Sequence, residues 1–273
     1  MKYTVLTLFP EITDAFFTNS IMARAIKRGI IEYRALNIRD YACDRHKTCD
    51  DAPYGGGPGM LMLPEPLGLA IKDALYSGSQ ASDDSTGKKP CVIYLSPSGR
   101  PFNQDLARKL AAERELILIC GRYEGIDQRI IDRYVDDEIS IGDYVLSSGE
   151  VAALVVIDAT YRLVDRVICA HSLAEESFSD GLLEYPQFTR PEVYDIMKVP
   201  EVLLSGHHEQ IRHWRLEKRV EKTMRQRPDM ILRGREFGIF NDEINSIVNR
   251  VAGGCRRAGN EAEGEEDERN SGY

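Results

Sequence analysis

The 273-residue sequence has no apolar run that approaches the length of a membrane span. Its opening residues, YTVLTLF, are typical of a strand and lack the basic and apolar regions of a signal peptide. The six cysteines show no paired spacing, which argues against a disulfide framework. We therefore expect a cytoplasmic protein with no membrane partner.

Several chemical motifs are also missing. The sequence contains no GxGxxG fingerprint, no GxxxxGK[ST] phosphate loop, no GxSxG nucleophile and no HExxH metal motif. Cys43, His46 and Cys49 lie close together, but no second Cys/His pair follows at the spacing of a zinc finger. These absences exclude the common nucleotide hydrolases and zinc proteases, and we predict no metal site from the sequence.

Acidic residues outnumber basic ones in the whole chain, but basic residues are concentrated in one segment. The net charge is −9, and residues 253–273 hold six acids against three basic residues with almost nothing apolar. Residues 207–235, by contrast, carry nine Arg/Lys against four Asp/Glu. A local surplus of cations in an acidic protein is typical of a surface that contacts phosphates.

Strand-like and helix-like segments alternate through the first two thirds of the chain, which predicts a mostly parallel sheet with helices on both faces. Three expected strands, ending at Leu95, Cys120 and Ile141, run directly into the turns SPSGRP, GRYEGID and GDYVLSSGE. Ligands bind such sheets at the carboxyl ends of the strands. We therefore expect these turns to form one pocket.

The segment DDAPYGGGPGM, residues 50–60, contains four glycines and two prolines within eleven residues. Pro53 and Pro58 restrict the backbone, so the segment predicts a shaped loop with exposed amides rather than a flexible linker. The sequence alone leaves open whether this loop binds a ligand or is a tight structural turn.

Beyond Arg190 the pattern becomes helical, with Ser205 as the expected cap of a long helix. Along that helix Arg212, Arg215, Arg219 and Lys222 follow 3, 4, 3 spacing, which places them on one face. Such a face is often only solvated, but here it also fits the phosphates of a folded RNA.

Six motifs appear together and in order: PYGGGPGM, GRYEGID, SIGDYVLSSGE, IDATYRL, SFSDGLLEYPQFTRP and VLLSGHHEQIRHWRL. This combination resembles the bacterial tRNA (guanine-N1)-methyltransferase family, also called TrmD-like, from Met1 to about Arg250. The resemblance implies methylation of the guanosine at tRNA position 37, next to the anticodon. It also implies S-adenosyl-L-methionine as the methyl donor, and a homodimer with active sites across its interface. Magnesium dependence is an expectation from the family only.

The implied fold is α/β: a trefoil-knotted SPOUT methyltransferase domain with a small, mostly helical C-terminal domain. We expect a cofactor-binding catalytic domain over 1–165, a flexible linker over 166–189, a tRNA-binding domain over 190–250 and a disordered acidic tail over 251–273. The knot follows from the resemblance and from no general rule of chain topology.

The resemblance also assigns site residues. Those implied to bind the cofactor are Tyr94, Leu95, Ser96, Gly99, Gly121, Tyr123, Gly125, Ser140, Ile141, Gly142, Tyr144, Leu146 and Gly149. Those implied to bind substrate or tRNA are Asp50, Gly57, Gly59, Asp180, Glu184, His208, Arg215 and Arg219. Glu176 is the implied general base, which removes the N1 proton, and Arg162 is the implied cation, which stabilises charge developing on O6.

The chain departs from the family pattern at several of these positions. Ser98 and Ser148 replace the usual Gln and Gly, and Glu184 and Gln187 stand where Asp and His are common. Glu176 replaces an Asp, which keeps the carboxylate and lengthens its reach. Asp180 lies four residues further on and is the competing candidate for the base.

Two other functions stay open at this point. A ribose 2′-O-methyltransferase of the same knotted class would share the cofactor turns without needing a carboxylate near a purine. A non-catalytic RNA-binding protein would keep the fold and lose turnover, although the intact glycine turns and Arg162 argue against it.

Overall fold

The computed structural model describes residues 1–80, 89–169 and 176–253. It divides into two compact units, Met1–Ala170 and His171–Tyr273. Residues 170–175 of the expected linker and residues 254–273 of the expected acidic tail lie outside the described residues.

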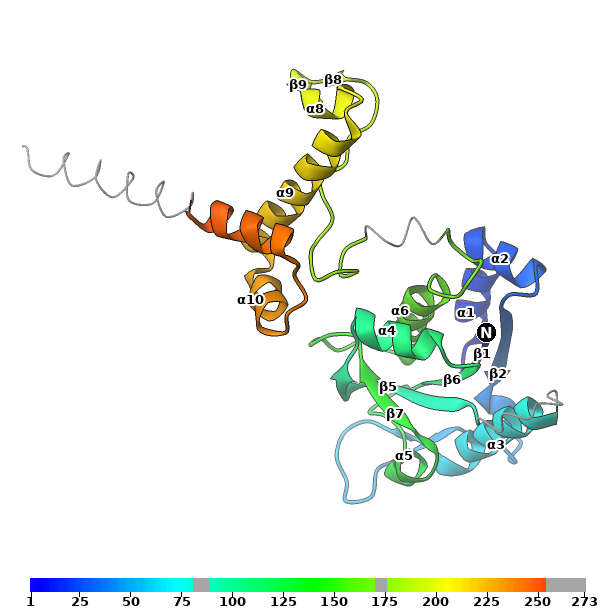
Figure 1. Cartoon of the computed structure of the whole chain (residues 1–273). Coiled ribbons are helices and arrows are strands. Elements are labelled where there is room, and N and C mark those ends of the chain that lie inside the picture. Colours follow the sequence, from blue (N-terminus) through cyan, green and yellow to red (C-terminus); the bar gives the residue numbers. More distant parts are fainter. Residues whose placement is uncertain (81–88, 170–175, 254–273) are drawn as a thin grey trace, which may run out of the picture. The chain divides into compact units, whose positions relative to one another are not determined.

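A five-stranded sheet forms the centre of the first unit (Figure 1). Its strands are β1 (Lys2–Thr7), β2 (Glu32–Asn37), β5 (Cys91–Pro101), β6 (Glu115–Cys120) and β7 (Asp137–Ser140), in the order β2-β1-β6-β5-β7. Every pair in this sheet is parallel. The predicted parallel α/β architecture is therefore confirmed.

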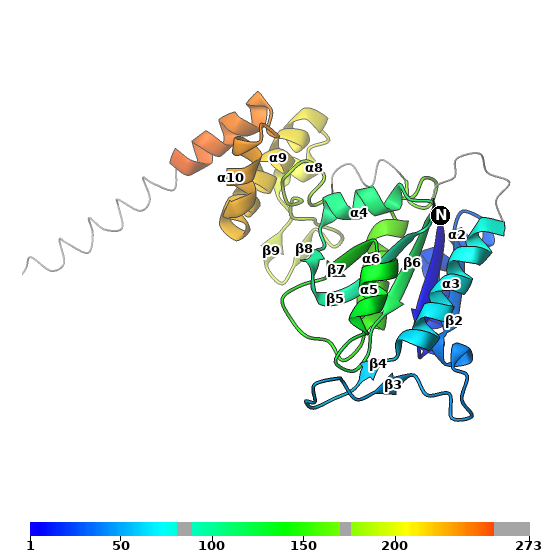
Figure 2. The same cartoon turned by 90° about the horizontal axis from the view of Figure 1, so that it is seen from below.

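Helices cover both faces of this sheet, as Figures 1 and 2 show from two directions. One face carries α1 (Pro10–Phe17), α2 (Ser20–Lys27), α4 (Gln104–Ala111) and α6 (Gly149–Tyr161). The other carries the short helix η1 (Ile38–Tyr41), α3 (Pro64–Gln80) and α5 (Gln128–Tyr134).

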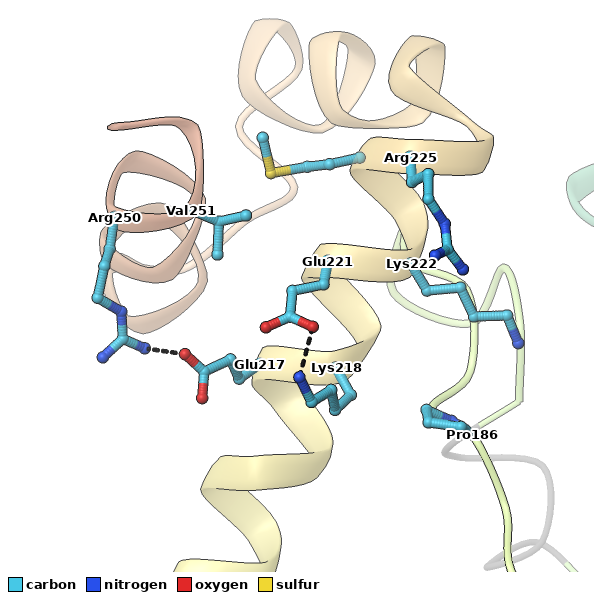
Figure 3. A pocket seen from close by; sticks show the side chains of 9 residues that line it. Pro186, Glu217, Lys218, Glu221, Lys222, Arg225, Arg250 and Val251 are labelled. Atoms are coloured by element: carbon cyan, nitrogen blue, oxygen red, sulfur yellow. Dashed lines mark hydrogen bonds and ion pairs between the residues drawn. The ribbon is translucent and has the colours of Figure 1, made fainter. Parts of the chain in front are cut away.

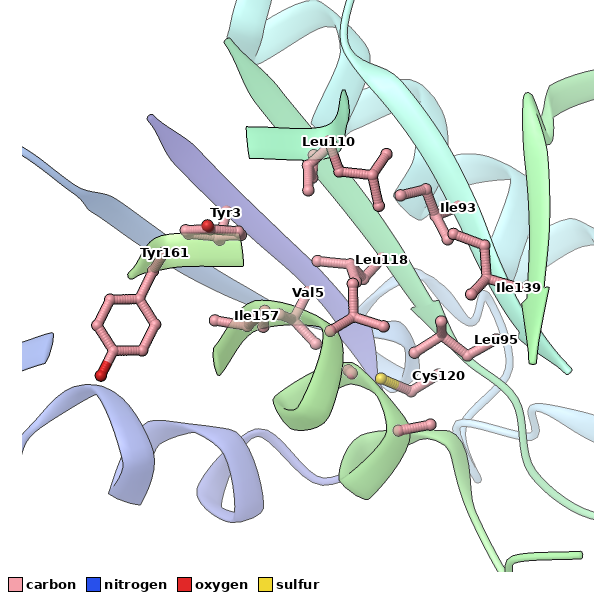
Figure 4. Packing of buried hydrophobic residues seen from close by; sticks show 14 of the residues in the cluster. Tyr3, Val5, Ile93, Leu95, Leu110, Leu118, Cys120, Ile139, Ile157 and Tyr161 are labelled. Carbon is pink, nitrogen blue, oxygen red and sulfur yellow. The ribbon is translucent and has the colours of Figure 1, made fainter. Parts of the chain in front are cut away.

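The central strand β6 shows why two cores form. Successive side chains of a strand point to opposite faces, so Leu116 and Leu118 pack with one set of helices and Ile117 and Ile119 with the other. All four side chains are fully buried. Figure 4 shows the first of these cores, in which Leu118 lies near Val5 of β1 and Ile157 of α6. A strand buried on both faces explains the uninterrupted apolar run LILIC, which follows Glu115.

Two local features of the first unit are irregular. Helices α1 and α2 are separate, because Ser20 adopts a positive φ of 57° and interrupts the backbone between them. The strand ending at Leu95 continues to Pro101, with a register shift against β7 between Leu95 and Arg100. The first expected turn is thus partly an irregular strand.

The glycine-rich loop is closed at its base by a short antiparallel pair, β3 (Asp50–Asp51) and β4 (Leu61–Met62). Because the pair joins the two ends of the segment, the glycines between them project as one loop. The shaped loop predicted from Pro53 and Pro58 is present.

The second unit contains a hairpin and helices. The hairpin is β8 (Val193–Tyr194) with β9 (Met197–Lys198), and the helices are α8 (Glu201–Leu204), α9 (His208–Gln226), α10 (Pro228–Glu236) and a further helix over 242–253. Val220 of α9, Ile231 of α10 and Phe240 share its buried core. Ser205 ends α8 instead of capping α9, since its hydroxyl donates back to the Val202 carbonyl.

Part of the segment expected to be a linker packs into this second unit. Leu182 is fully buried in its core, and the Leu183 backbone N–H donates to the Thr223 hydroxyl of α9 over 2.9 Å. Leu182 therefore anchors this part of the expected linker in the core of the second unit. The domain boundaries proposed from the sequence remain predictions.

Candidate functional site

The carboxyl ends of β6, β5 and β7 lie side by side, because these strands are neighbours in the sheet. The turns that follow them enclose a cavity of about 300 Å³, within the size range of small-molecule pockets. Its lining includes every residue predicted to bind the cofactor except Gly99. The structure thus brings the three predicted turns together, and their role in binding stays a prediction.

Two glycines bring the polypeptide chain close together at this pocket. A Cβ on Gly149 would lie 2.7 Å from the Cys120 Cα, and a Cβ on Gly121 would lie 2.9 Å from the Tyr94 ring. The Gly149 N–H donates to the Gly121 carbonyl over 2.9 Å. The start of α6 is therefore packed directly on the end of β6, which leaves no room for side chains between them.

Two tyrosines form part of the pocket wall. Burial raises the pKa of the Tyr94 hydroxyl, which receives a hydrogen bond from the Ile126 backbone. Tyr123 has a positive φ of 58°, and partial burial together with the neighbouring Asp50 raises its pKa. Both groups stay protonated near neutral pH, so they act as walls and hydrogen-bond donors. Asp50, a predicted substrate residue, thus contacts the cofactor turn through Tyr123.

The glycine-rich loop runs beside the turn that follows β6. The Glu124 N–H donates to the Met60 carbonyl and the Met62 N–H donates to the Gly125 carbonyl, each over 3.0 Å. A Cβ on Gly59 would lie 2.6 Å from Glu124 Oε1. The bare backbone at Gly59 therefore makes room for Glu124, a side chain of the pocket lining.

We predict that Gly59→Ala displaces Glu124 and lowers methyl transfer more than Gly56→Ala does. Both glycines have positive φ, 87° and 78°, so the backbone strain is similar, but a Cβ on Gly56 meets nothing within 4 Å. Strain of this kind costs about 1 kcal/mol or more at either position. Measuring methyl transfer and thermal stability of both variants separates the clash from the strain. Equal activities would show that Glu124 needs no such space.

Arg162 does not lie at this pocket within one chain. It follows the last residue of α6, whereas the pocket lies at the first residue, Gly149. A helix of 13 residues is about 20 Å long. A single chain therefore leaves the predicted cation and the predicted cofactor pocket at opposite ends of α6.

Glu176 lies in a compact loop of the second unit. Its carbonyl accepts hydrogen bonds from the Ser179 N–H and hydroxyl, at 3.2 and 2.7 Å. The Phe178 N–H donates to the Leu182 carbonyl, and the Glu184 N–H donates to the Ser177 hydroxyl. These hydrogen bonds close the loop that carries both Glu176 and Glu184. Glu176 is half-buried.

The two candidate bases differ in their surroundings. Both carboxylate oxygens of Asp180 accept from the guanidinium of Arg219, with the Nη1 contact at 2.9 Å. Arg219 is 8% exposed and also donates to the Leu183 carbonyl. Asp180 is thus a structural ion-pair partner, which leaves Glu176 as the better candidate.

The predicted cationic face of α9 is only partly present as a solvent-exposed surface. Arg219 is buried, and Arg212 is paired with Glu209 and Glu243. Arg215 lies over the Tyr185 ring at 4.7 Å, and His208 is exposed at the start of α9. Arg219 is therefore not a solvent-exposed cation of this face, and its contact with RNA stays a prediction.

Sequence reasoning missed three polar residues beside the pocket, of which two are fully buried. Thr7 and Glu150 are 0% exposed, and Arg122 lines the cavity next to them. Glu150 is the last residue of the motif SIGDYVLSSGE, but nothing in that motif marks its carboxylate as buried. The spacing of residues in the sequence does not reveal that a charged side chain in the first turn of an apolar helix is buried.

No group of three or more His, Cys, Asp or Glu side chains arranged to hold a metal occurs within residues 1–80, 89–169 and 176–253. Magnesium dependence stays an expectation from the family. No helix in these ranges is both long and apolar enough to cross a membrane.

The fold and the pocket define an α/β protein with a glycine-lined ligand site at the carboxyl edge of a parallel sheet. Residues 1–233 match the family described as tRNA (Guanine-1)-methyltransferase TrmD. The chain belongs to this family.

Named relatives agree with this assignment. The tRNA (guanine-N(1)-)-methyltransferase of Treponema denticola is 58% identical over 248 residues, which cover 91% of this chain and 98% of the relative. The protein of the same name from Treponema pallidum is 55% identical, covering 92% and 96%. That of Borreliella burgdorferi is 54% identical, covering 85% and 94%.

Proposed function

We propose that this protein transfers a methyl group from S-adenosyl-L-methionine to N1 of the guanosine at position 37 of tRNA. The observation that carries the proposal is the pocket at the carboxyl ends of β5, β6 and β7, in a chain whose relatives bear the name of this activity. A cytoplasmic location, where tRNA is modified, is part of the proposal.

The cavity fits the methyl donor by shape and chemistry. Backbone groups at Gly121, Gly125 and Gly142 line it without side chains, and tyrosine and leucine side chains supply apolar walls for an adenine. The donor supplies an activated methyl group on a sulfonium with a good leaving group. The protein's task is then to hold the acceptor base in line and to remove its proton.

Glu176 is the proposed general base. Guanine N1 carries a proton at neutral pH, and a carboxylate within hydrogen-bond reach can accept it as the new bond forms. Asp180 is less suited because Arg219 occupies both of its oxygens. Arg162 is proposed to stabilise the negative charge that develops on guanine O6.

A homodimer would assemble these groups, and we propose one with the trefoil-knotted SPOUT fold of the family. Arg162 and the cofactor pocket lie at opposite ends of α6, so a second copy is needed to place Arg162 beside a pocket. Val151 and Val155 of α6 are 51% and 43% exposed, four residues apart on one helical face. Val145, next to the pocket, is 85% exposed. This apolar surface suits contact with another chain.

Mixing two inactive variants tests this arrangement. At a cofactor concentration that fills the wild-type pocket but lies well below the Kd of the weakened one, Gly149→Ala should leave its pocket largely empty and Glu176→Gln should lack the base, so neither variant works alone. If each site combines the pocket of one copy with Glu176 of the other, random exchange restores about a quarter of wild-type activity, because half the dimers hold one complete site. No recovery after subunit exchange, verified by mass spectrometry, would contradict a shared site.

The tRNA surface of the second unit is proposed to include Lys222, which the helical spacing already placed on the cationic face, and Arg225, which the sequence did not single out. An open hollow of about 790 Å³ lies beside α9, and its lining includes Lys222, Arg225 and Pro186 (Figure 3). Lys218 is paired with Glu221 and Arg250 with Glu217. Lys222 and Arg225 form no ion pair with any residue that the structure describes, so their charges are available for phosphates.

We predict that Lys222→Gln with Arg225→Gln weakens tRNA binding and lowers the salt slope of log Kd by about 1 to 2, since each phosphate contact releases about one counterion. Arg212→Gln is the matched control, because that cation is already neutralised by Glu209 and Glu243. Binding titrations over a range of salt concentrations measure the slope. An unchanged slope in the double variant would place the RNA surface elsewhere.

The competing ribose 2′-O-methyltransferase and the non-catalytic RNA-binding protein are separated by product analysis. After reaction with tRNA, nuclease digestion and chromatography should yield N1-methylguanosine. A 2′-O-methylated nucleoside would support the first alternative, and no methylated product with intact cofactor binding would support the second.

A further inference from the structure

A buried polar chain links β1 to the cofactor pocket. The Thr7 hydroxyl donates to Glu150 Oε1 over 2.6 Å, and the Phe9 N–H donates to the Thr7 oxygen over 2.9 Å. Glu150 is 0% exposed at the start of α6. Its second oxygen, Oε2, lies 3.8 Å from Arg122 Nε, and neither atom has a hydrogen-bond partner.

The side chain of Arg122 is held by an ion pair and by an aromatic ring, and it makes no hydrogen bond to a residue that the structure describes. Its guanidinium carbon lies 4.3 Å above the centre of the Phe9 ring, and the buried carboxylate of Glu150 is its ion-pair partner. The side chain is 26% exposed although Nε is buried, so its exposed surface belongs to other atoms. Arg122 lines the pocket and makes no side-chain hydrogen bond to a described residue. Its donors are therefore available to a ligand.

This arrangement is poor for stability alone. A buried ion pair whose facing atoms make no hydrogen bond does not recover the cost of removing both charges from water. Buried polar atoms without partners are rare in native proteins and are concentrated at sites that serve another purpose. An arginine held by charge and by a ring, with its donors unused, is suited to bind a carboxylate.

We infer that Arg122 binds the carboxylate of the cofactor's amino-acid part and that Glu150 is the positioning residue that holds Arg122 for this contact. The inference rests on the proposed function, because it assumes that the pocket takes S-adenosyl-L-methionine. Glu150 acts through Arg122 and touches no ligand itself. Thr7 fixes the orientation of Glu150 by donating to its first oxygen.

The test compares two ligands by calorimetry. S-adenosylhomocysteine carries the amino-acid carboxylate, and 5′-methylthioadenosine lacks the whole amino-acid part. We expect Arg122→Gln and Glu150→Gln each to weaken S-adenosylhomocysteine about tenfold, the loss of one charge-assisted contact, while 5′-methylthioadenosine is unchanged. The double variant should be no weaker than the weaker single variant, because the two residues act in one chain.

Glu115→Gln is the matched control. Glu115 is also a buried carboxylate, bonded to the Thr4 hydroxyl over 3.0 Å and paired with Lys2, but it begins β6, at the strand end away from the pocket. It should lower stability without changing the ratio of the two affinities. If Glu150→Gln does not fold, Glu150→Asp replaces it, since it keeps the charge and shortens the reach.

The outcomes are distinct. Failure of the wild-type protein to bind either ligand contradicts the proposed function. Normal wild-type binding with an equal loss of both ligands in the variants overturns the inference. A loss confined to Arg122→Gln overturns the positioning role of Glu150.

Discussion

Replacing Glu176 by Gln is expected to reduce single-turnover methyl transfer by about 10² to 10⁴, the range for loss of a general base. The amide keeps the size and hydrogen bonding of the carboxylate but cannot accept the N1 proton at neutral pH. Binding of S-adenosylhomocysteine and of tRNA should stay within about twofold of wild type. Single-turnover conditions are needed because slow product release can hide a defect in the chemical step.

Glu176→Asp and Asp180→Asn complete this experiment. Glu176→Asp restores the residue usual in the family and should keep substantial activity if the loop over 176–184 shifts by one methylene. Asp180→Asn removes the charge that pairs with buried Arg219, so it should lower the stability of the second unit more than it lowers the rate of chemistry. Normal turnover by Glu176→Gln together with an inactive but folded Asp180→Asn would make Asp180 the base.

Gly149→Ala is expected to weaken cofactor binding about 10- to 100-fold, which corresponds to overpacking of about 1–3 kcal/mol. The new Cβ would lie 2.7 Å from the Cys120 Cα and 2.8 Å from the Gly121 nitrogen. Both are backbone atoms at the end of β6, which cannot rotate away as a side chain can. Relief of the clash would separate α6 from the cofactor turn and break the hydrogen bond from the Gly149 N–H to the Gly121 carbonyl.

Ser148→Ala is the control for Gly149→Ala. Ser148 precedes α6, lines the same pocket and makes no side-chain capping bond to the helix. Its replacement should change the affinity for S-adenosylhomocysteine by about twofold or less. Calorimetry measures the affinity of both variants for S-adenosylhomocysteine. It thereby compares the backbone clash in Gly149→Ala with the loss of a hydroxyl in Ser148→Ala. Wild-type affinity in Gly149→Ala would show that the close packing at α6 is not needed for the pocket.

The parallel sheet and the pocket could be predicted from the sequence because both follow from local patterns. Apolar runs such as LILIC mark doubly buried strands, and the turns after Leu95, Cys120 and Ile141 must meet wherever neighbouring parallel strands end. The glycine-rich loop was predicted as shaped backbone, but its contact with Glu124 depends on how two distant segments pack and could not be read from spacing.

The surface of α9 shows where pattern reasoning fails. Helical spacing places Arg212, Arg215 and Arg219 on one face, but it does not say whether that face meets solvent or protein. Leu182 and Asp180, about 40 residues earlier, cover part of it, so Arg219 is buried and paired with Asp180, and its contact with RNA stays a prediction. Glu150 was overlooked for the same reason, because its burial depends on Thr7 and Arg122 from other strands and turns.

The proposed methylation of one guanosine in tRNA can be measured directly as transfer of a labelled methyl group to tRNA transcripts. Two transcripts that differ only at position 37 are incubated with the protein and labelled S-adenosyl-L-methionine. We expect stoichiometric labelling of the transcript with guanosine at position 37 and no labelling when adenosine replaces it. Equal labelling of both transcripts, or of neither, would contradict methylation at that guanosine.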